Sequence, residues 1–187
     1  LPGMGEIRRT EAALEGLDAL VLPLHGDLPP AAQDLALRPA QGRRVVLANA
    51  IAETSLTVPG VRIVIDGGYR RAPRFDPASG MTRLATERVS RAAADQRAGR
   101  AGREAPGIAI RLWTAAAQRG LRLHDRPEIL EAELSGLLLD CTAWGTPPGK
   151  LMFPDAPPDG ALASARSLLN DLGAMDETGA ITPLGAR

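Results

Sequence analysis

Length, composition and charge restrict this chain to a few classes of protein. It has 187 residues, of which 44% are hydrophobic and 3% aromatic, enough to bury one large core or two small ones. The scarcity of aromatic rings excludes base stacking as the main mode of any nucleic-acid contact. The formal net charge is zero, yet residues 43–103 hold twelve arginines against five acidic residues, and both flanking segments are acidic. A basic middle predicts an anion-binding surface confined to one part of the molecule.

The sequence shows no pattern for a membrane or for disulfide bonds. No apolar run approaches the roughly 18 residues that a membrane span needs, and no secretory signal pattern opens the chain. The single cysteine, Cys141, lies in an apolar segment, so we expect it to be a small core residue. We therefore expect a soluble, cytoplasmic protein with no membrane partner.

Strands and helices are expected to alternate up to about residue 113. Their apolar runs are nearly continuous, which is typical of a parallel sheet covered on both faces. The pattern predicts helices at 7–17 and 31–38, strands at 19–24, 43–48, 61–66 and 106–113, and a hairpin at 74–84. We expect an α/β fold with a parallel sheet flanked by helices.

From residue 114 onward no strand of comparable strength is found. Pro127 is expected to open a helix that runs to Trp144. Asp159 is expected to cap a second helix, which Gly173 ends. The inner face of the first helix is predicted to hold Leu130, Leu134, Leu137, Leu138, Cys141 and Trp144. This part is predicted to be a small, mostly helical region.

Residues 90–103, Ser-Arg-Ala-Ala-Ala-Asp-Gln-Arg-Ala-Gly-Arg-Ala-Gly-Arg, form the most distinctive stretch. On a helix at about 100° per residue, Gln96, Arg100 and Arg103 share one narrow face, and Arg97 points about a quarter-turn away. The two glycines cost roughly 1 kcal/mol each in a helix, but they leave the backbone bare beside the arginines. Two guanidinium groups on one face repel each other unless an anion lies between them, and their forked geometry suits phosphate. The stretch predicts a phosphate site; a solvated basic helix face is the alternative.

Residues 49–57, Asn-Ala-Ile-Ala-Glu-Thr-Ser-Leu-Thr, follow a predicted strand and offer a second set of polar groups. The loop at the carboxyl end of a strand is where α/β sheets place ligands. Its backbone N–H groups and the hydroxyls of Thr54, Ser55 and Thr57 are able to meet phosphates or ribose, and Asn49 can bond a phosphate. An ordinary hydroxyl-capped helix start is the alternative.

These stretches resemble the motifs of a known family. Gln-Arg-Ala-Gly-Arg-Ala-Gly-Arg at 96–103 resembles motif VI of superfamily 2 helicases in the DEAH-box form. Residues 51–57 resemble motif V, although Asn49 and Ala50 stand where threonine and asparagine are usual, and Leu-Pro-Gly-x-x-Glu-Ile at 1–7 resembles motif IV. Arg-Phe-Asp-Pro and Leu-Ser-Gly-Leu-Leu look closest to the bacterial HrpB subgroup. The resemblance implies a second RecA-like domain at 1–115 and the start of a winged-helix region at 116–187.

By this resemblance, the chain helps to hydrolyse ATP that a neighbouring domain holds. Arg100 and Arg103 are implied to be arginine fingers on the phosphates, and Gln96 to place the attacking water. Thr57 is implied to lie beside the nucleotide. Leu37 takes the place of an aromatic residue that can stack on the adenine, so it would offer apolar contact only.

The resemblance also implies a track for single-stranded RNA, with DNA not excluded. Its contacts are expected at the first loop, at the motif V loop and at the hairpin, which in this family lies against the strand. The implied residues are Gly3, Asn49, Thr54, Ser55, Arg70, Arg71, Arg74 and Arg83. A solvated hairpin is the alternative for the arginines.

Two motifs of such enzymes are absent from this sequence. There is no Gly-x-x-x-x-Gly-Lys-Ser/Thr and no Asp-Glu-x-His, the motifs that bind triphosphate and Mg²⁺. We expect both on a first RecA-like domain of the same protein, and we expect no metal ligands here. The chain is thus expected to be a helicase fragment that does not hydrolyse ATP alone. A non-catalytic nucleic-acid- or partner-binding α/β module is the alternative.

Overall fold

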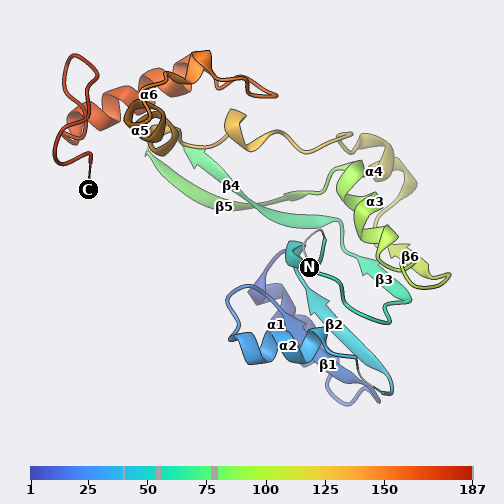
Figure 1. The fold of residues 1–187 in the computed structure, drawn as a ribbon. Coiled ribbons are helices and arrows are strands. Elements are labelled where there is room, and N and C mark those ends of the chain that lie inside the picture. The colour runs from blue at the N-terminus through green and yellow to red at the C-terminus, as the bar shows by residue number, and fades with distance from the viewer. Residues whose placement is uncertain (40, 54–55, 77–79, 187) are drawn as a thin grey trace. The chain divides into compact units, whose positions relative to one another are not determined.

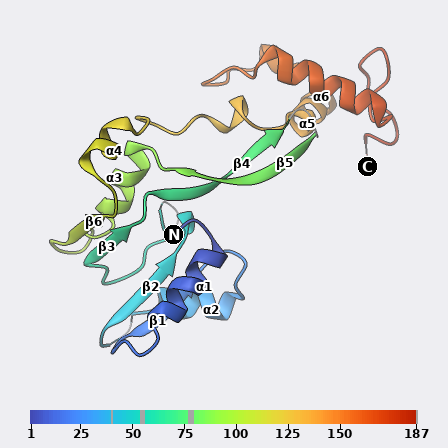
Figure 2. The same cartoon turned by 180° about the vertical axis from the view of Figure 1, so that it is seen from behind.

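A computed structural model describes residues 1–39, 41–53, 56–76 and 80–186 of the chain (Figures 1 and 2). The chain divides into two compact units, which are considered separately below. The first comprises Leu1–Ala72 and Ala85–Asp125, and the second comprises Pro73–Leu84 and Arg126–Arg187. The domain boundary expected after residue 115 stays a prediction. Among the described residues, no helix combines the length and the apolar character needed to cross a bilayer.

The first unit begins with a parallel pair of strands and two helices. The elements are α1 (Met4–Ala13), β1 (Leu20–Leu24), α2 (Pro30–Leu37) and β2 (Arg44–Ala48). Leu20 of β1 lies opposite Arg44 of β2, and the register continues to Leu24 and Ala48. Both helices pack on β1, and Pro30 fits the first turn of α2 because proline pre-sets the helical φ angle there. The buried core contains Ile7, Leu22, Leu24, Ala36 and Leu47.

A second parallel pair completes the sheet elements of this unit. The elements are η1 (Ala50–Ala52), β3 (Ile63–Asp66), α3 (Arg91–Gly99), β6 (Ile108–Arg111) and α4 (Ala115–Gly120). β3 and β6 pair with Ile63 opposite Ile108, and α3 packs on both strands through the buried Ala93 and Ala94. Small alanine side chains allow this close approach. The parallel pairs and their helices confirm the predicted α/β class.

A long hairpin separates β3 from α3. Its strands are β4 (Tyr69–Asp76) and β5 (Met81–Arg88), which pair as a two-stranded sheet. The hairpin is longer than the predicted 74–84. Its base belongs to the first unit, whereas Pro73–Leu84 belong to the second.

The second unit is mostly helical, as predicted. It contains η2 (Glu128–Leu130), α5 (Ser135–Ala143), η3 (Pro148–Lys150) and α6 (Asp159–Asp171). α5 packs on α6, and Met175 forms a short antiparallel bridge with Ile181. Gly173, at φ +66°, ends α6 as expected. Asp159 is the first helical residue and Pro158 is the N-cap, so the predicted cap was wrong. The core contains Leu134, Leu138, Ala165, Leu169, Ala174 and Met175.

The single helix expected from Pro127 to Trp144 was wrong. It is replaced by η2 and α5, because the carboxylate of Glu133 accepts a hydrogen bond from the Ser135 backbone N–H at 2.7 Å and another from its hydroxyl. The helix therefore begins afresh at Ser135. Trp144 follows the end of α5 and is 78% exposed, so it does not belong to the inner face. Cys141 is buried, as expected.

The arginine-rich helix also ends earlier than expected. Ser90 caps α3 by accepting a hydrogen bond from the Ala93 N–H at 3.1 Å. The helix ends at Gly99 with Arg100 as its C-cap, and Arg103 lies beyond it in a turn. Gly99 is the last helical residue and Gly102 follows three residues later, and the low helix propensity of glycine favours an end at this point. Arg103 is therefore placed by the turn and not by helical periodicity.

Candidate nucleotide site and nucleic-acid surface

The end of α3 is tied to the segment that follows β2. The Arg100 guanidinium donates to the carbonyl oxygen of Glu53, with Nε at 3.0 Å, and to that of Leu56, with Nη1 at 3.1 Å. Arg103 Nη1 donates to Thr57 Oγ1 at 2.6 Å, and both of these residues are exposed. The structure thus brings together two implied catalytic arginines and the implied nucleotide-side threonine, which are more than forty residues apart in the chain.

The other two residues that the resemblance assigns to the nucleotide, Gln96 and Leu37, differ in how much they are exposed. Gln96 is exposed on α3. Leu37, at the end of α2, is half-buried and packs against the apolar cluster formed by Leu22, Leu24 and Ala36. The structure therefore gives Leu37 a packing role in the first unit, and its contact with a base stays a prediction.

The turn after α3 is held in place by contacts of its backbone and side chains. Glu104 Oε2 accepts from the Gly60 N–H at 3.0 Å, and Arg62 Nε donates to the carbonyl oxygen of Pro106 at 2.9 Å. A Cβ on Gly107 would lie 2.0 Å from the Ala101 oxygen and 2.6 Å from the Arg62 oxygen, closer than any side chain tolerates. Only glycine fits there, and the closed turn fixes the backbone on which Arg103 stands.

Arg97 takes part in a buried ion cluster that the sequence did not reveal. Its Nε donates to Glu53 Oε2 at 2.8 Å and its Nη1 to Asp66 Oδ1 at 3.0 Å. The side chains of Arg97, Glu53 and Asp66 are 11%, 12% and 4% exposed. Two features of the sequence could have indicated this cluster. On a helix, Arg97 points about a quarter-turn away from Arg100 and Arg103, and acidic residues lie near the ends of the predicted strands that became β2 and β3.

The first loop and the base of the hairpin come together. Gly3 is buried, and a Cβ there would lie 3.1 Å from Arg71 Nε. Arg71 also lies 3.8 Å from a carboxylate oxygen of Glu6, and its side chain is 43% exposed. The Leu1 backbone nitrogen donates to the Ala48 carbonyl at 2.8 Å. Of these two implied nucleic-acid contacts, Arg71 therefore reaches solvent, whereas Gly3 is covered by the Arg71 side chain.

Asn49 stands directly after β2 on the same side. Its Oδ1 accepts from the Ile51 N–H at 3.2 Å and so caps η1. Phosphate oxygens only accept hydrogen bonds, so a phosphate contact would come from the amide nitrogen, and the bond to Ile51 leaves this nitrogen available for it. Thr54 and Ser55 lie outside the described residues.

Arg70 is held by carboxylates within the first unit. Its guanidinium pairs with Glu87 at 2.8 Å and with Asp125 at 2.8 Å, and the side chain is 20% exposed. Two carboxylates compensate its charge, so this geometry favours a structural role over the expected phosphate contact.

The two remaining implied nucleic-acid contacts, Arg74 and Arg83, belong to the second unit. Arg74 pairs with Glu131, and Arg83 is exposed on β5. Arg83 is the better placed of the two to meet an anion from solvent.

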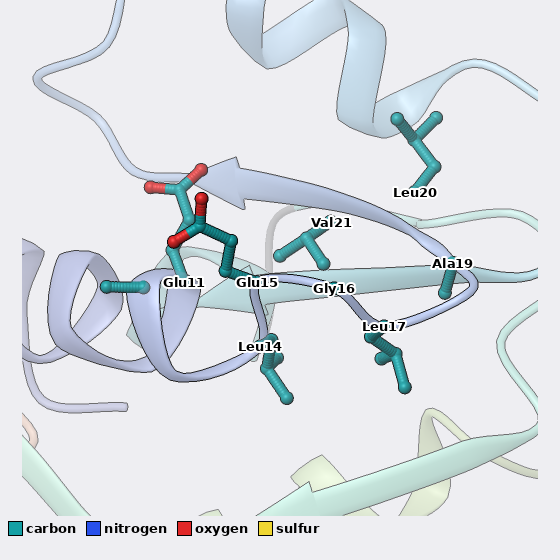
Figure 3. A pocket seen from close by; sticks show the side chains of 9 residues that line it. Glu11, Leu14, Glu15, Gly16, Leu17, Ala19, Leu20 and Val21 are labelled. Atoms are coloured by element: carbon teal, nitrogen blue, oxygen red, sulfur yellow. The ribbon is translucent and has the colours of Figure 1, made fainter.

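An open pocket of about 350 Å³ lies between the end of α1 and the start of β1 (Figure 3). Glu11 and Glu15 line it together with apolar side chains such as Leu14 and Leu17. It is at the amino end of β1, whereas α/β sheets bind ligands beyond the carboxyl ends of their strands. Two carboxylates also repel phosphate, so this pocket is not the nucleotide site.

Comparison with known proteins agrees with this geometry. The model of the helicase conserved C-terminal domain matches residues 6–105. The chain belongs to this helicase family. The matched range includes α3, the turn that carries Arg103, and Thr57. Both motifs that the sequence analysis assigned to the nucleotide thus lie within the helicase domain.

The relatives extend the similarity over nearly the whole helicase fragment. It is 47% identical over 94% of its length to the ATP-dependent RNA helicase HrpB of Escherichia coli (strain K12), of which it covers 22%. It is 40% identical over 91% of its length to the pre-mRNA-splicing factor ATP-dependent RNA helicase prp22 of Schizosaccharomyces pombe, of which it covers 15%. The chain thus spans less than a quarter of these relatives.

Solved structures give the same result for the fold. A crystal structure of the E. coli DEAH/RHA helicase HrpB matches 99% of the helicase fragment with a TM-score of 0.90 and 43% identity, and the fragment covers 24% of that chain. A second one, of the E. coli DExH-box NTPase HrpB, matches with a TM-score of 0.86 and 45% identity. The resemblance to DEAH-box helicases of the HrpB subgroup is confirmed.

Proposed function

We propose that this chain is the second RecA-like domain, with the start of the winged-helix region, of an ATP-dependent RNA helicase. The contact between Arg103 and Thr57 carries the proposal, because it places an exposed guanidinium beside an exposed hydroxyl at 2.6 Å. Both groups donate hydrogen bonds and suit phosphate oxygens. The names of the relatives supply the reaction class, since HrpB and prp22 are ATP-dependent RNA helicases.

In this proposal, bound ATP supplies the phosphoryl group that is transferred to water. Arg100 and Arg103 stabilise the negative charge that develops on the phosphate oxygens, and Gln96 orients the attacking water. Thr57 holds the Arg103 side chain at the edge of the site. The apolar side chain of Leu37 contacts the nucleotide base.

The metal ion belongs to another part of the protein in this proposal. Within the described ranges, no group of three or more His, Cys, Asp or Glu residues could hold a metal. We propose that Mg²⁺ is held by the first RecA-like domain of the same protein, which also carries the triphosphate. This domain is the main intramolecular partner that we propose.

The nucleic-acid partner that we propose is single-stranded RNA. Arg71 covers the buried Gly3 and presents a half-exposed guanidinium that a phosphate can approach; Asn49 and, in the second unit, Arg83 are further contacts in this proposal. Phosphate contacts position a strand without reading its sequence, and they do not distinguish RNA from DNA. A cytoplasmic location is part of the same proposal.

The test uses the full-length protein with Arg100→Ala and Arg103→Ala. Removal of an arginine finger lowers kcat for ATP hydrolysis by about 10³- to 10⁵-fold in related phosphoryl-transfer enzymes, and we expect a loss in this range with RNA affinity retained. Arg8→Ala, which removes an exposed arginine of α1, is the matched control and should leave kcat unchanged. Full ATPase activity in both finger variants would contradict the proposal and leave a binding module.

A further inference from the structure

The buried cluster of Arg97, Glu53 and Asp66 connects three elements that the nucleotide site depends on. Arg97 comes from the last turn of α3, Glu53 follows η1, and Asp66 ends β3. We propose that Arg97 and Glu53 are positioning residues: they hold the end of α3 against Glu53, Leu56 and Thr57, so that Arg100 and Arg103 face the phosphates. This inference rests on the proposed function of these two arginines.

Arg97 itself is poorly placed to bind phosphate. Its side chain is 11% exposed, and two carboxylates lie within 3.0 Å of its nitrogens. An incoming anion would meet the net negative charge of the pair of carboxylates as well as the guanidinium. The geometry therefore separates Arg97 from the exposed Arg103, although both belong to one arginine-rich stretch.

Glu53 links Arg97 to Arg100 through two different groups. Its carboxylate accepts from Arg97 Nε at 2.8 Å, and its backbone carbonyl accepts from Arg100 Nε at 3.0 Å. A shift of Glu53 would therefore move an acceptor that orients Arg100. Among the described residues, the hydrogen bond printed to this carboxylate comes from Arg97, so the ion pair is the point at which this orientation can be tested.

The other end of the cluster is anchored to a strand. Asp66 Oδ1 accepts from the Gly68 N–H at 2.8 Å as well as from Arg97. Arg97 Nη1 also donates to the Tyr69 carbonyl at 3.2 Å. Arg97 thus uses two nitrogens of its planar fork for acceptors on three residues, an arrangement that the single ammonium of lysine does not reproduce.

The experiment is a double-mutant cycle in the full-length protein, with kcat for ATP hydrolysis measured at saturating ATP and RNA. Glu53→Gln keeps the size of the side chain and the backbone carbonyl but removes the charge that holds Arg97. We expect it to lower kcat by about tenfold, with KM for ATP changed by less than about twofold, because an interaction made only in the transition state is lost. In the Arg100→Ala background the same change should lower kcat by less than about twofold, since coupled residues are not additive.

Two further variants control for folding and for charge. Asp95→Asn removes a mostly exposed carboxylate on the same helix, which pairs with Arg111, and should leave kcat unchanged in both backgrounds. Arg97→Lys keeps the charge but not the fork, and should reproduce the loss seen with Glu53→Gln. If Glu53→Gln does not fold, as judged by thermal unfolding, Arg97→Lys takes its place in the cycle.

The outcomes separate this inference from the proposed function. Equal losses of kcat in the wild-type and Arg100→Ala backgrounds, or no loss at all with a folded Glu53→Gln protein, would overturn the positioning role alone. Full activity of Arg100→Ala would instead overturn the proposed function, and this inference with it.

Discussion

The arginine-rich segment at the end of α3 and the base of the β4–β5 hairpin each contain one arginine paired with carboxylates and one exposed arginine. In each region one arginine is held by two carboxylates: Arg97 by Glu53 and Asp66, and Arg70 by Glu87 and Asp125. In each region another arginine is exposed. Arg103 contacts a hydroxyl, and Arg71 lies 3.8 Å from its nearest paired carboxylate.

This comparison shows that a count of arginines does not define an anion-binding surface. An arginine between two carboxylates adds little positive potential around it, whereas one bound to a neutral hydroxyl keeps its full charge. The basic excess of residues 43–103 thus divides into arginines that hold the first unit together and arginines that are available to phosphate. Four predictions test this division.

The largest effect is expected on stability. Arg97→Ala removes the cation that pairs with Glu53 and Asp66, and Arg70→Ala leaves Asp125 unpaired by Arg70 while Glu87 keeps Arg122 at 3.5 Å. Breaking a buried ion pair typically costs about 3–5 kcal/mol in the free energy of unfolding. We expect the upper half of this range for Arg97 because it is the more buried of the two. Arg103→Ala and Arg71→Ala should stay within about 0.5 kcal/mol.

Urea unfolding of the 187-residue chain, followed by circular dichroism, measures these differences. A similar free energy of unfolding for all four variants would show that the paired and the exposed arginines contribute equally to stability, which would contradict this division.

The contact between Arg103 and Thr57 gives the next largest effect. In the full-length protein, Thr57→Val keeps the shape of the side chain and removes the hydroxyl that accepts from Arg103. In our proposal this hydroxyl positions the Arg103 guanidinium at the phosphates, and misplacement of a catalytic group is costly, so we expect kcat for ATP hydrolysis to fall by about tenfold. Thr57→Ser retains the hydroxyl and should keep most of the activity; equal losses in both variants would contradict the role of this contact.

The start of α3 provides a reference that touches neither kind of arginine. Ser90→Ala removes the helix cap at 3.1 Å and should lower the free energy of unfolding by about 1 kcal/mol. ATPase activity of the full-length variant at 25 °C should be unchanged. A large loss of activity would mean that any weakening of α3 impairs catalysis. A loss of kcat in Arg97→Lys would then not be evidence for a positioning role of Arg97.

The smallest effect is expected in the salt dependence of RNA binding. Each phosphate contact with a single strand contributes about 0.7 to the slope of log K against log salt concentration. Arg71→Ala should reduce the slope by about this amount, as measured by fluorescence anisotropy with a single-stranded RNA and the full-length protein. Arg70→Ala, tested at a temperature where it remains folded, should leave the slope unchanged; the reverse result would exchange the roles of the two residues.

Much of the fold and part of the site could be predicted from local patterns. The alternation of apolar runs indicated the parallel α/β architecture, and the motif spacing indicated the family. The ends of elements were less predictable. The helix α3 ends at Gly99, and the Arg100 side chain after it donates to carbonyl oxygens of Glu53 and Leu56, which lie more than forty residues away in the chain. The expected helix up to Trp144 was interrupted by the carboxylate of Glu133, which no apolar periodicity could signal.

The acceptors of Arg97 could not be predicted from the sequence. Glu53 and Asp66 lie 44 and 31 residues away along the chain, and nothing local pairs them with Arg97. For the hairpin a signal was available, since neighbouring residues of a strand point to opposite faces. This alternation predicts that Arg70 and Arg71 differ in environment, although it does not tell which of them faces the carboxylates.

The absence of space at Gly107 has a consequence for how variants of this domain should be interpreted. A methyl group there would collide with main-chain oxygens on both sides of the turn, and the turn would have to reopen. In our proposal, a substitution at this uncharged position, which contacts no phosphate, would lower ATP hydrolysis because it displaces the backbone that carries Arg103. Loss-of-function screens would therefore mark Gly107 as essential for a reason that is entirely steric.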